Sequence, residues 1–261
     1  MRVIVCIKQV PGTTQVGIDP QTNTLIRQGV ASIINPFDTY ALEEGVRIRE
    51  RFGGSVTVIT MGPPQAEEAL RECLSLGADD TILLSDPAFA GADTLATSYT
   101  LAKAIERLES FDIVLCGRQT ADGDTGQVGP ELAEWLAVPI VTNVRKIHEI
   151  SEGKAILERM TEEGYEVMEM PLPGIITVVK EINIPRLPSL RGQMRAKSAK
   201  IPIWTAQDVD LDKDAIGLAG SPTRVIKVFT PPKAQRGELI KGHMEQQVDQ
   251  LISKLKETKV I

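Results

Sequence analysis

The sequence predicts an α/β fold in which a parallel sheet carries helices on both faces, giving three layers. Two observations predict it. Short apolar runs alternate with helix-length segments through the first half of the 261-residue chain. The runs are apolar at consecutive positions, which is typical of strands that are buried on both faces. Strand–helix–strand alternation of this kind implies parallel strands joined by right-handed crossovers.

The first half is expected to repeat this unit several times. An apolar, β-branched run at 2–7 predicts the first strand. Asn35-Pro36 is typical of an N-cap followed by a first-turn proline, and Asp38 would lie in the positive first turn of that helix. Gly53-Gly54 would end the helix. Further strands are expected at 56–61, 81–84 and 111–116, followed by helices that begin near residues 63, 93 and 131.

The second half is expected to be less regular. Two runs, 154–159 and 166–170, can pair as strands around the acidic turn 161–164, and an apolar strand is expected at 175–179. From residue 184 to about 232 the sequence is proline-rich and non-periodic, with a basic stretch at 186–200. A loop of that length is unusual inside a compact domain.

This change of texture predicts two parts. Residues 1–183 are expected to form the α/β nucleotide-binding domain, and residues 184–261 an extended arm that packs on another chain. The arm is expected to end in an amphipathic helix. Its apolar stripe has spacings of three and four and consists of Ile240, Met244, Val248, Leu251 and Leu255.

Composition excludes several classes of function. The formal net charge is −6 and aromatic residues make up 4%, so a nucleic-acid surface is not expected. The chain has no apolar stretch of the length that spans a bilayer, and no signal sequence is evident. Three cysteines in apolar runs and two distant histidines predict no metal site. We therefore expect a cytoplasmic, metal-free protein without a membrane segment.

The segment 117–129 is the most informative part of the sequence. It leaves the carboxyl end of an expected buried strand and leads into a helix, and it contains four glycines. Backbone amides and helix N-termini at such an edge bind anionic groups, and glycine permits close approach. A solvated connection is the alternative. The predicted binding residues in the loop are Gly117, Arg118, Gln119, Thr120, Ala121, Asp122, Gly123, Asp124, Thr125, Gly126, Gln127 and Val128.

Two other helix starts are expected at the same edge. Asp93 is a predicted N-cap, and Thr94 and Thr97 lie in the first turn on the side that faces the core. Their hydroxyls could bind a phosphate or ribitol, or could serve only in capping. Asn35 and Asp38 begin the helix after the first strand and should approach the same crevice.

Catalytic motifs are absent from the sequence. There is no P-loop, no GxGxxG after the first strand, no GxSxG, and no histidine placed as a base. The sequence therefore favours nucleotide binding over nucleotide cleavage and contains no predicted catalytic residue. If the protein takes part in catalysis, a cofactor must supply the chemistry.

Several segments resemble electron transfer flavoprotein beta subunits. They are 3–11, 32–38, 60–65, 117–128 and 171–178, in the same order as in that family and spread over most of the chain. The resemblance implies an adenine-nucleotide-hydrolase-like α/β domain and a heterodimer with a flavin-bearing alpha subunit. It also implies electron transfer to a partner dehydrogenase, of acyl-CoA or hydroxy-acid type.

Within that family, segments 89–98 and 122–130 are similar to the electron-bifurcating members. The resemblance then implies a beta-subunit FAD that oxidises NADH, with one electron passing to ferredoxin or flavodoxin and the other to the alpha-subunit FAD. The alternative is a non-bifurcating beta subunit that holds structural AMP and exchanges electrons with an acyl-CoA dehydrogenase. The implied FAD site comprises Cys6, Asn35, Asp38, Met61, Asp93, Thr94, Thr97 and the 117–128 loop. Cys6 and Met61 would contribute packing and backbone, or would be ordinary strand-end core.

Residues 185–194 resemble the family's recognition loop, in which an exposed leucine contacts the dehydrogenase. Leu190 is the matching position, and Arg186, Arg191 and Arg195 flank it. An apolar side chain inside a charged rim is typical of an interaction hot spot. The alternative is a solvated basic turn. A free-standing adenine-nucleotide binder of the universal-stress type would share the fold but would not need the arm after residue 184.

Overall fold

The computed structural model describes residues 1–12, 17–18, 25–26, 32–226 and 237–261. The chain divides into two compact units, residues 1–226 and 227–261, which are described separately. Residues 184–226, the first part of the predicted arm, pack within the first unit, and residues 227–236 of the arm lie outside the described residues.

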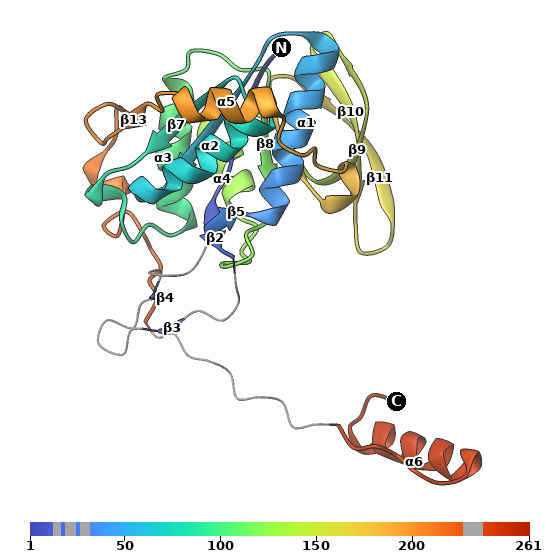
Figure 1. Ribbon diagram of the computed structural model, residues 1–261. Coiled ribbons are helices and arrows are strands. Elements are labelled where there is room, and N and C mark those ends of the chain that lie inside the picture. Colours follow the sequence, from blue (N-terminus) through green and yellow to red (C-terminus); the bar gives the residue numbers. More distant parts are fainter. Residues whose placement is uncertain (13–16, 19–24, 27–31, 227–236) are drawn as a thin grey trace. The chain divides into compact units, whose positions relative to one another are not determined.

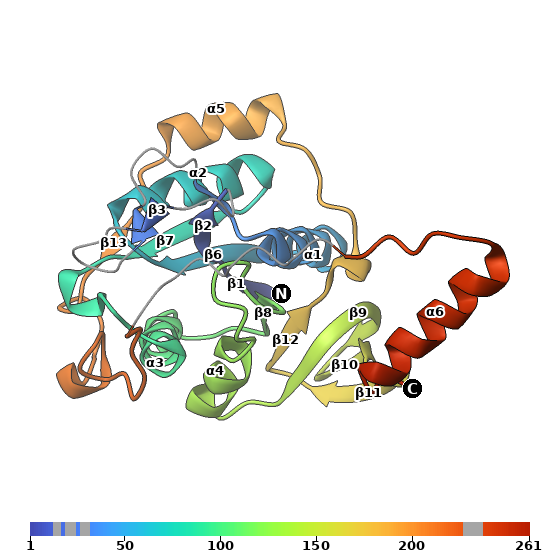
Figure 2. The same ribbon diagram turned by 90° about the horizontal axis from the view of Figure 1, so that it is seen from below.

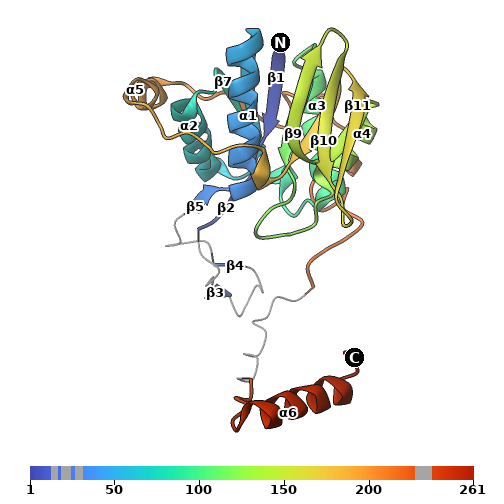
Figure 3. The same cartoon turned by 90° about the vertical axis from the view of Figure 1, so that its right-hand side faces the viewer.

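A nine-stranded, mostly parallel sheet forms the centre of the first unit (Figure 1). Its strand order is β11-β10-β9-β12-β8-β1-β6-β7-β13. Among the described strands of this sheet, only β10 runs against the others: it is antiparallel to both β9 and β11. These three strands form one end of the sheet, which Figure 3 shows beside α1. The strands are β1 (Arg2–Cys6), β6 (Ser55–Met61), β7 (Asp80–Leu84), β8 (Ile113–Gly117), β9 (Ile140–Ser151), β10 (Lys154–Met160), β11 (Tyr165–Pro171), β12 (Gly174–Val178) and β13 (Ile203–Trp204). Outside this sheet, β2 (Gln9–Pro11) pairs with β5 (Ser32–Ile34), and β3 (Gly17–Ile18) with β4 (Leu25–Ile26).

Helices cover both faces of the sheet, as Figure 2 shows. One face carries α1 and α2, and the other carries α3 and α4. A further helix, α5, packs on the outside of α2. The helices of this unit are α1 (Pro36–Phe52), α2 (Glu67–Leu76), α3 (Thr94–Glu106), α4 (Val128–Leu136) and α5 (Leu190–Ser198), with short 3-10 turns η1 (Pro64–Ala66), η2 (Pro87–Phe89), η3 (Lys180–Ile182) and η4 (Lys213–Ala215).

Alternate residues of the central strands belong to two separate cores. Val3 and Val5 of β1 pack with α1 and α2, whereas Ile4 and Cys6 pack with α3 and α4. This is why the central strands are apolar at consecutive positions. The predicted three-layer α/β fold is confirmed.

Several short strands, and two longer elements, β9 and α5, were not predicted. β9 has apolar residues at irregular spacing and two register shifts against β10, so it lacks the alternation that marks a half-buried strand. The helix α5 falls in the non-periodic segment, where no helix was predicted, so the expectation of irregular structure was wrong for these residues. Most of its residues are exposed and only Ala196 is buried, so its sequence carries little helical periodicity.

The second unit contains α6 (Met244–Glu257). The helix has no buried residue, and its apolar side chains, including Met244, Val248 and Leu251, are exposed. The predicted amphipathic stripe is therefore present, except that Ile240 precedes the helix. The packing of this helix on an alpha subunit stays a prediction. None of the helices in the described part of the chain is long and apolar enough to cross a bilayer.

Candidate functional site

The strand order places a topological switch point at β1. From β1 the chain builds outward through β6 and β7, then returns to the other side of β1 with β8. The carboxyl ends of β1 and β8 therefore lie side by side, with Cys6 paired to Cys116. In open α/β sheets the crevice outside such strand ends is where ligands bind. The 117–128 loop begins at this position.

Asn35 ties the loop to α1 and does not cap its own helix. It stands at the predicted N-cap position, but its side chain makes no capping hydrogen bond. Its Nδ2 donates to the Gln119 carbonyl at 2.8 Å, and its Oδ1 accepts from the Ala121 amide at 3.1 Å. The amide side chain thus satisfies one donor and one acceptor of a loop that has few internal partners. The capping role predicted from the sequence was wrong.

Asp38 is buried beneath the start of the loop. It lies in the first turn of α1, as predicted, and its Oδ2 accepts from the Lys8 amide at 2.7 Å. Burial raises its pKa to about 7, although hydrogen bonds from Asn35, Lys8 and Gly117 partly oppose the effect. A Cβ at Gly117 would stand 2.3 Å from Oδ1 of Asp38, so this close approach requires glycine.

Lys8 also belongs to the site, although no motif in the sequence indicated it. Its Nζ pairs with the Asp122 carboxylate at 2.8 Å. Burial alone would raise the pKa of Asp122, but the hydrogen bond and charge of Lys8 outweigh burial and the pKa lies below its usual value. Because Asp122 is paired, its negative charge is compensated at an edge expected to receive an anion.

The other side of the loop is tied to α3. The Thr94 hydroxyl lies 3.2 Å from Gln127 Oε1 and 3.0 Å from Glu131 Oε1. The second carboxylate oxygen of Glu131 is buried and has no hydrogen-bond partner among the described residues. The loop therefore runs between two helix N-termini, with Asn35 holding one end and Thr94 lying against the other.

Asp93 caps α3 as predicted, but it also holds a distant segment. One oxygen accepts from the Ala96 amide at 3.2 Å. The other accepts from the amide and the hydroxyl of Thr223 at 3.0 and 2.8 Å, and the Asp93 amide donates to the Ser221 hydroxyl at 2.8 Å. Burial opposes ionisation, but the hydrogen bonds from Thr223 and Ala96 keep the pKa of Asp93 below its usual value. Both of its oxygens are thus engaged within the chain.

The remaining predicted residues lie in two places. Cys6 is buried at the end of β1, and Met61 is half-buried at the end of β6. Thr97 is half-buried, less than one helical turn after Thr94. Leu190 lies apart from this edge, at the start of α5 near the C-terminal end of α2. The structure therefore brings the predicted nucleotide-binding residues to one edge of the sheet. Leu190, which was predicted to contact a partner protein, lies elsewhere.

The middle of the loop is exposed, and its backbone amides are available. Among the described residues, the amides of Gly123, Thr125 and Gly126 have no acceptor. Asp124 and Gly126 adopt positive φ angles of 53° and 63°, which turn the chain within the loop. Such amides, followed directly by the N-terminus of α4, form a site for an anionic group such as a phosphate.

Within the described part of the chain, the histidine and thiol groups nearest in kind to a base or nucleophile are His148 and Cys116. His148 lies on β9, where Nε2 contacts Glu158 of β10 at 2.9 Å, and Cys116 is a buried thiol whose pKa is raised by its contact with Cys6 and by burial. Neither is arranged as a base or nucleophile.

Comparison with known proteins assigns the chain to a family. Residues 22–209 match the family model described as electron transfer flavoprotein domain. The chain is 53% identical to an electron transfer flavoprotein subunit beta of Thermoanaerobacterium thermosaccharolyticum, over 100% of both chains. It is 52% identical to the caffeyl-CoA reductase-Etf complex subunit CarD of Acetobacterium woodii, again over 100% of both. It is 47% identical to protein FixA of Azotobacter vinelandii, over 93% of this chain and 89% of the relative. The chain belongs to the electron transfer flavoprotein family, among its beta subunits.

Proposed function

We propose that this chain pairs with a flavin-bearing alpha subunit and binds a second FAD at the carboxyl edge of its sheet. In the complex it takes electrons from NADH and passes one to ferredoxin or flavodoxin and the other, through the alpha-subunit FAD, to a partner dehydrogenase. The observation that carries the proposal is the 117–128 loop at the switch point, anchored by Asn35 and followed by a helix N-terminus.

The residues present fit a dinucleotide. The amides of Gly123, Thr125 and Gly126, which have no acceptor among the described residues, would hold the diphosphate, assisted by the N-terminal turn of α4. The Thr94 and Thr97 hydroxyls lie in the first turn of α3, where a ribitol or phosphate oxygen could accept from them. The Lys8–Asp122 pair limits the negative charge that the ligand meets. FAD, when bound, supplies the chemistry that accepts a hydride and releases single electrons.

AMP is the second candidate ligand, because its phosphate would satisfy the same amides. The resemblance of segments 89–98 and 122–130 to the bifurcating members supports FAD. Denaturing the purified heterodimer and identifying the released nucleotides separates the two. Two FAD per heterodimer support the proposal, whereas one FAD and one AMP would indicate a non-bifurcating electron carrier.

We further propose that Leu190 contacts the partner dehydrogenase. Its side chain is 82% exposed at the start of α5, next to Leu187 at 88%. Leu190→Ala should raise the KM of the dehydrogenase for the flavoprotein about tenfold or more, as expected for truncation of an apolar hot spot. Flavin content should not change, since Leu190 lies away from the nucleotide edge. Loss of flavin, or an unchanged KM, would remove Leu190 from this role.

A further inference from the structure

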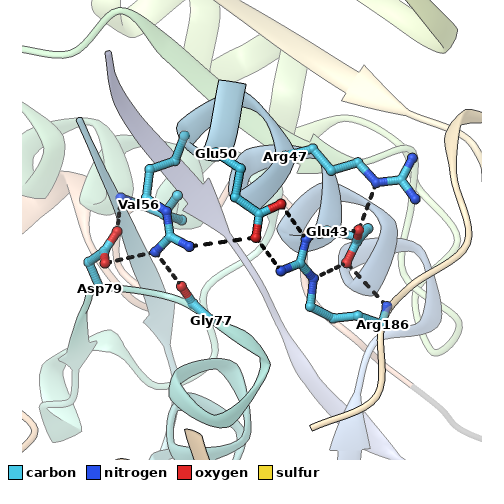
Figure 4. Close-up of polar contacts among 8 residues, drawn as sticks. Glu43, Arg47, Glu50, Val56, Gly77, Asp79 and Arg186 are labelled. Carbon is cyan, nitrogen blue, oxygen red and sulfur yellow. Dashed lines mark hydrogen bonds and ion pairs between the residues drawn. The ribbon is translucent and has the colours of Figure 1, made fainter. Parts of the chain in front are cut away.

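Arg186 attaches the segment before α5 to the surface of α1, as Figure 4 shows. Its Nε donates to Glu43 Oε2 at 2.8 Å and its backbone amide donates to the same oxygen at 3.1 Å. Its Nη1 and Nη2 donate to the two oxygens of Glu50 at 2.6 and 3.0 Å, and Nη2 also reaches Glu43 Oε1 at 3.2 Å. One guanidinium therefore spans two carboxylates that lie two turns apart on α1. We call these three residues the Arg186 clamp.

The clamp is stronger than an ordinary surface ion pair. The Glu43 side chain is only 4% exposed, and Arg47 of the same helix also donates to it at 2.7 Å. Arg186 and Arg47 together compensate this buried charge, so the loss of Arg186 would leave it only partly compensated. The planar fork of arginine suits two-point contacts of this kind, and lysine does not provide them. The pairing therefore fixes Arg186 in one geometry.

Other contacts hold the same segment at both ends. Asn183 Nδ2 donates to the Tyr40 carbonyl at 3.0 Å and to Glu44 Oε2 at 2.9 Å, just before the clamp. At the far end of α5, Arg71 Nη1 donates to the carbonyls of Ala196 and Ala199 at 2.6 and 3.2 Å. The backbone of 183–199 is thus fastened to α1 and α2, although most of its side chains point to solvent.

The side chains between these fastenings are apolar and exposed. Leu187, Leu190 and Met194 are 88%, 82% and 73% exposed. An apolar group on a tethered backbone loses less conformational freedom on binding than one on a free loop, and so binds more tightly for the same contact. Arg191, Arg195 and Lys197 of the same helix are also exposed, and this positive charge favours a partner surface with an apolar pocket and an acidic rim.

We propose that Arg186 is a positioning residue for dehydrogenase docking, and that the clamp presents Leu187 and Leu190 together as one contact. Arg186 acts through this segment rather than by touching the partner. The inference rests on the proposed docking role of Leu190. The inference goes beyond the docking role of Leu190 in two ways. It assigns to Arg186 the task of holding the leucines in place, and it makes Leu187 a second residue that contacts the dehydrogenase.

A double-mutant cycle in the intact heterodimer tests the inference. The variants are Arg186→Gln, Leu190→Ala and the pair together, with the KM and kcat of the partner dehydrogenase for the flavoprotein as readouts. Arg186→Gln should raise KM about tenfold, the cost of ordering one or two residues on binding, and leave kcat and flavin content unchanged. When Leu190 is already alanine, Arg186→Gln should raise KM by less than about a further threefold, because the effects of residues that act as a unit are not additive.

Two further variants serve as a control and as a milder substitution in the clamp. Lys103→Gln removes one positive charge and an ion pair with Glu106 on α3, and should leave KM unchanged. Glu50→Gln removes only the charge of the more exposed carboxylate of the clamp and should raise KM by a smaller factor. This variant therefore tests the positioning role if Arg186→Gln fails to fold. An unchanged KM in both Arg186→Gln and Glu50→Gln, or full additivity with Leu190→Ala, would overturn the positioning role alone. An unchanged KM in Leu190→Ala would overturn the docking proposal itself.

Discussion

Replacing Asn35 by alanine tests whether the nucleotide loop is held in place before ligand arrives. The substitution removes the donor to the Gln119 carbonyl and the acceptor for the Ala121 amide. Asn35 is fully buried, so water does not readily replace these bonds. Two neutral hydrogen bonds together with the buried groups left unpaired correspond to about 2–4 kcal/mol.

That loss should appear in two measurements. If the whole loss is expressed in binding, the affinity of the heterodimer for its beta-subunit nucleotide should fall about 30- to 700-fold, because each tenfold change corresponds to about 1.4 kcal/mol. Hydrogen exchange at Ala121 should accelerate in the nucleotide-free protein, since its amide loses its acceptor. The second readout separates loop anchoring from direct ligand contact, because no ligand is present.

Thr39→Ala is the matched control. Thr39 lies in the same first turn of α1, but among the described residues its hydroxyl donates only to the Pro36 carbonyl, at 2.7 Å, and makes no hydrogen bond to the loop. It should leave both nucleotide affinity and exchange at Ala121 unchanged. If Asn35→Ala bound nucleotide as tightly as the wild type and exchange at Ala121 stayed slow, the anchoring argument would be refuted.

Two other substitutions test the same edge. Asp38 has a pKa of about 7 in the folded protein and about 3.8 when unfolded, so it stabilises the fold most below about pH 4 and progressively less as pH rises towards 7. The free energy of unfolding in urea should be measured for the wild type and for Asp38→Asn between pH 4 and 7. The difference between the two proteins should fall by up to about 4 kcal/mol over this range. A difference that does not depend on pH would contradict this prediction. Asp93→Ala should cost about 1–2 kcal/mol as a lost N-cap and should speed hydrogen exchange at Ala96 and Thr223. The control Asp86→Ala should speed exchange at Ala88 and Ala206 instead. Equal effects of both variants on exchange at Thr223 would refute the proposed hydrogen bonds between Asp93 and Thr223.

The layered core could be predicted because its signals are local. The apolar runs that form β1, β6, β7 and β8 are buried at consecutive positions, and the helix starts at Pro36 and Thr94 follow from neighbouring residues. The same local reasoning failed for α5, whose fastening comes from Arg71, more than a hundred residues away. It also failed for β9, whose irregular pattern makes sense only beside β10 and β12.

The candidate site shows the same division. The 117–128 loop and the Asp93 cap were predictable from glycine content and capping preference. The sequence could not indicate that Asn35 would bond across 84 positions, or that Lys8 would pair with Asp122 across 114. These partners are set by the strand order, which brings the ends of β1 and β8 together. Long-range polar pairs therefore become visible only after the fold is known.

The most direct test of the proposed function is to count the nucleotides of the purified alpha–beta heterodimer and then add NADH and ferredoxin. We predict two FAD per heterodimer and reduction of ferredoxin that depends on NADH and on an acceptor for the partner dehydrogenase. One FAD with one AMP, and no ferredoxin reduction, would contradict the assignment of this edge to a catalytic flavin and leave a single-flavin electron carrier.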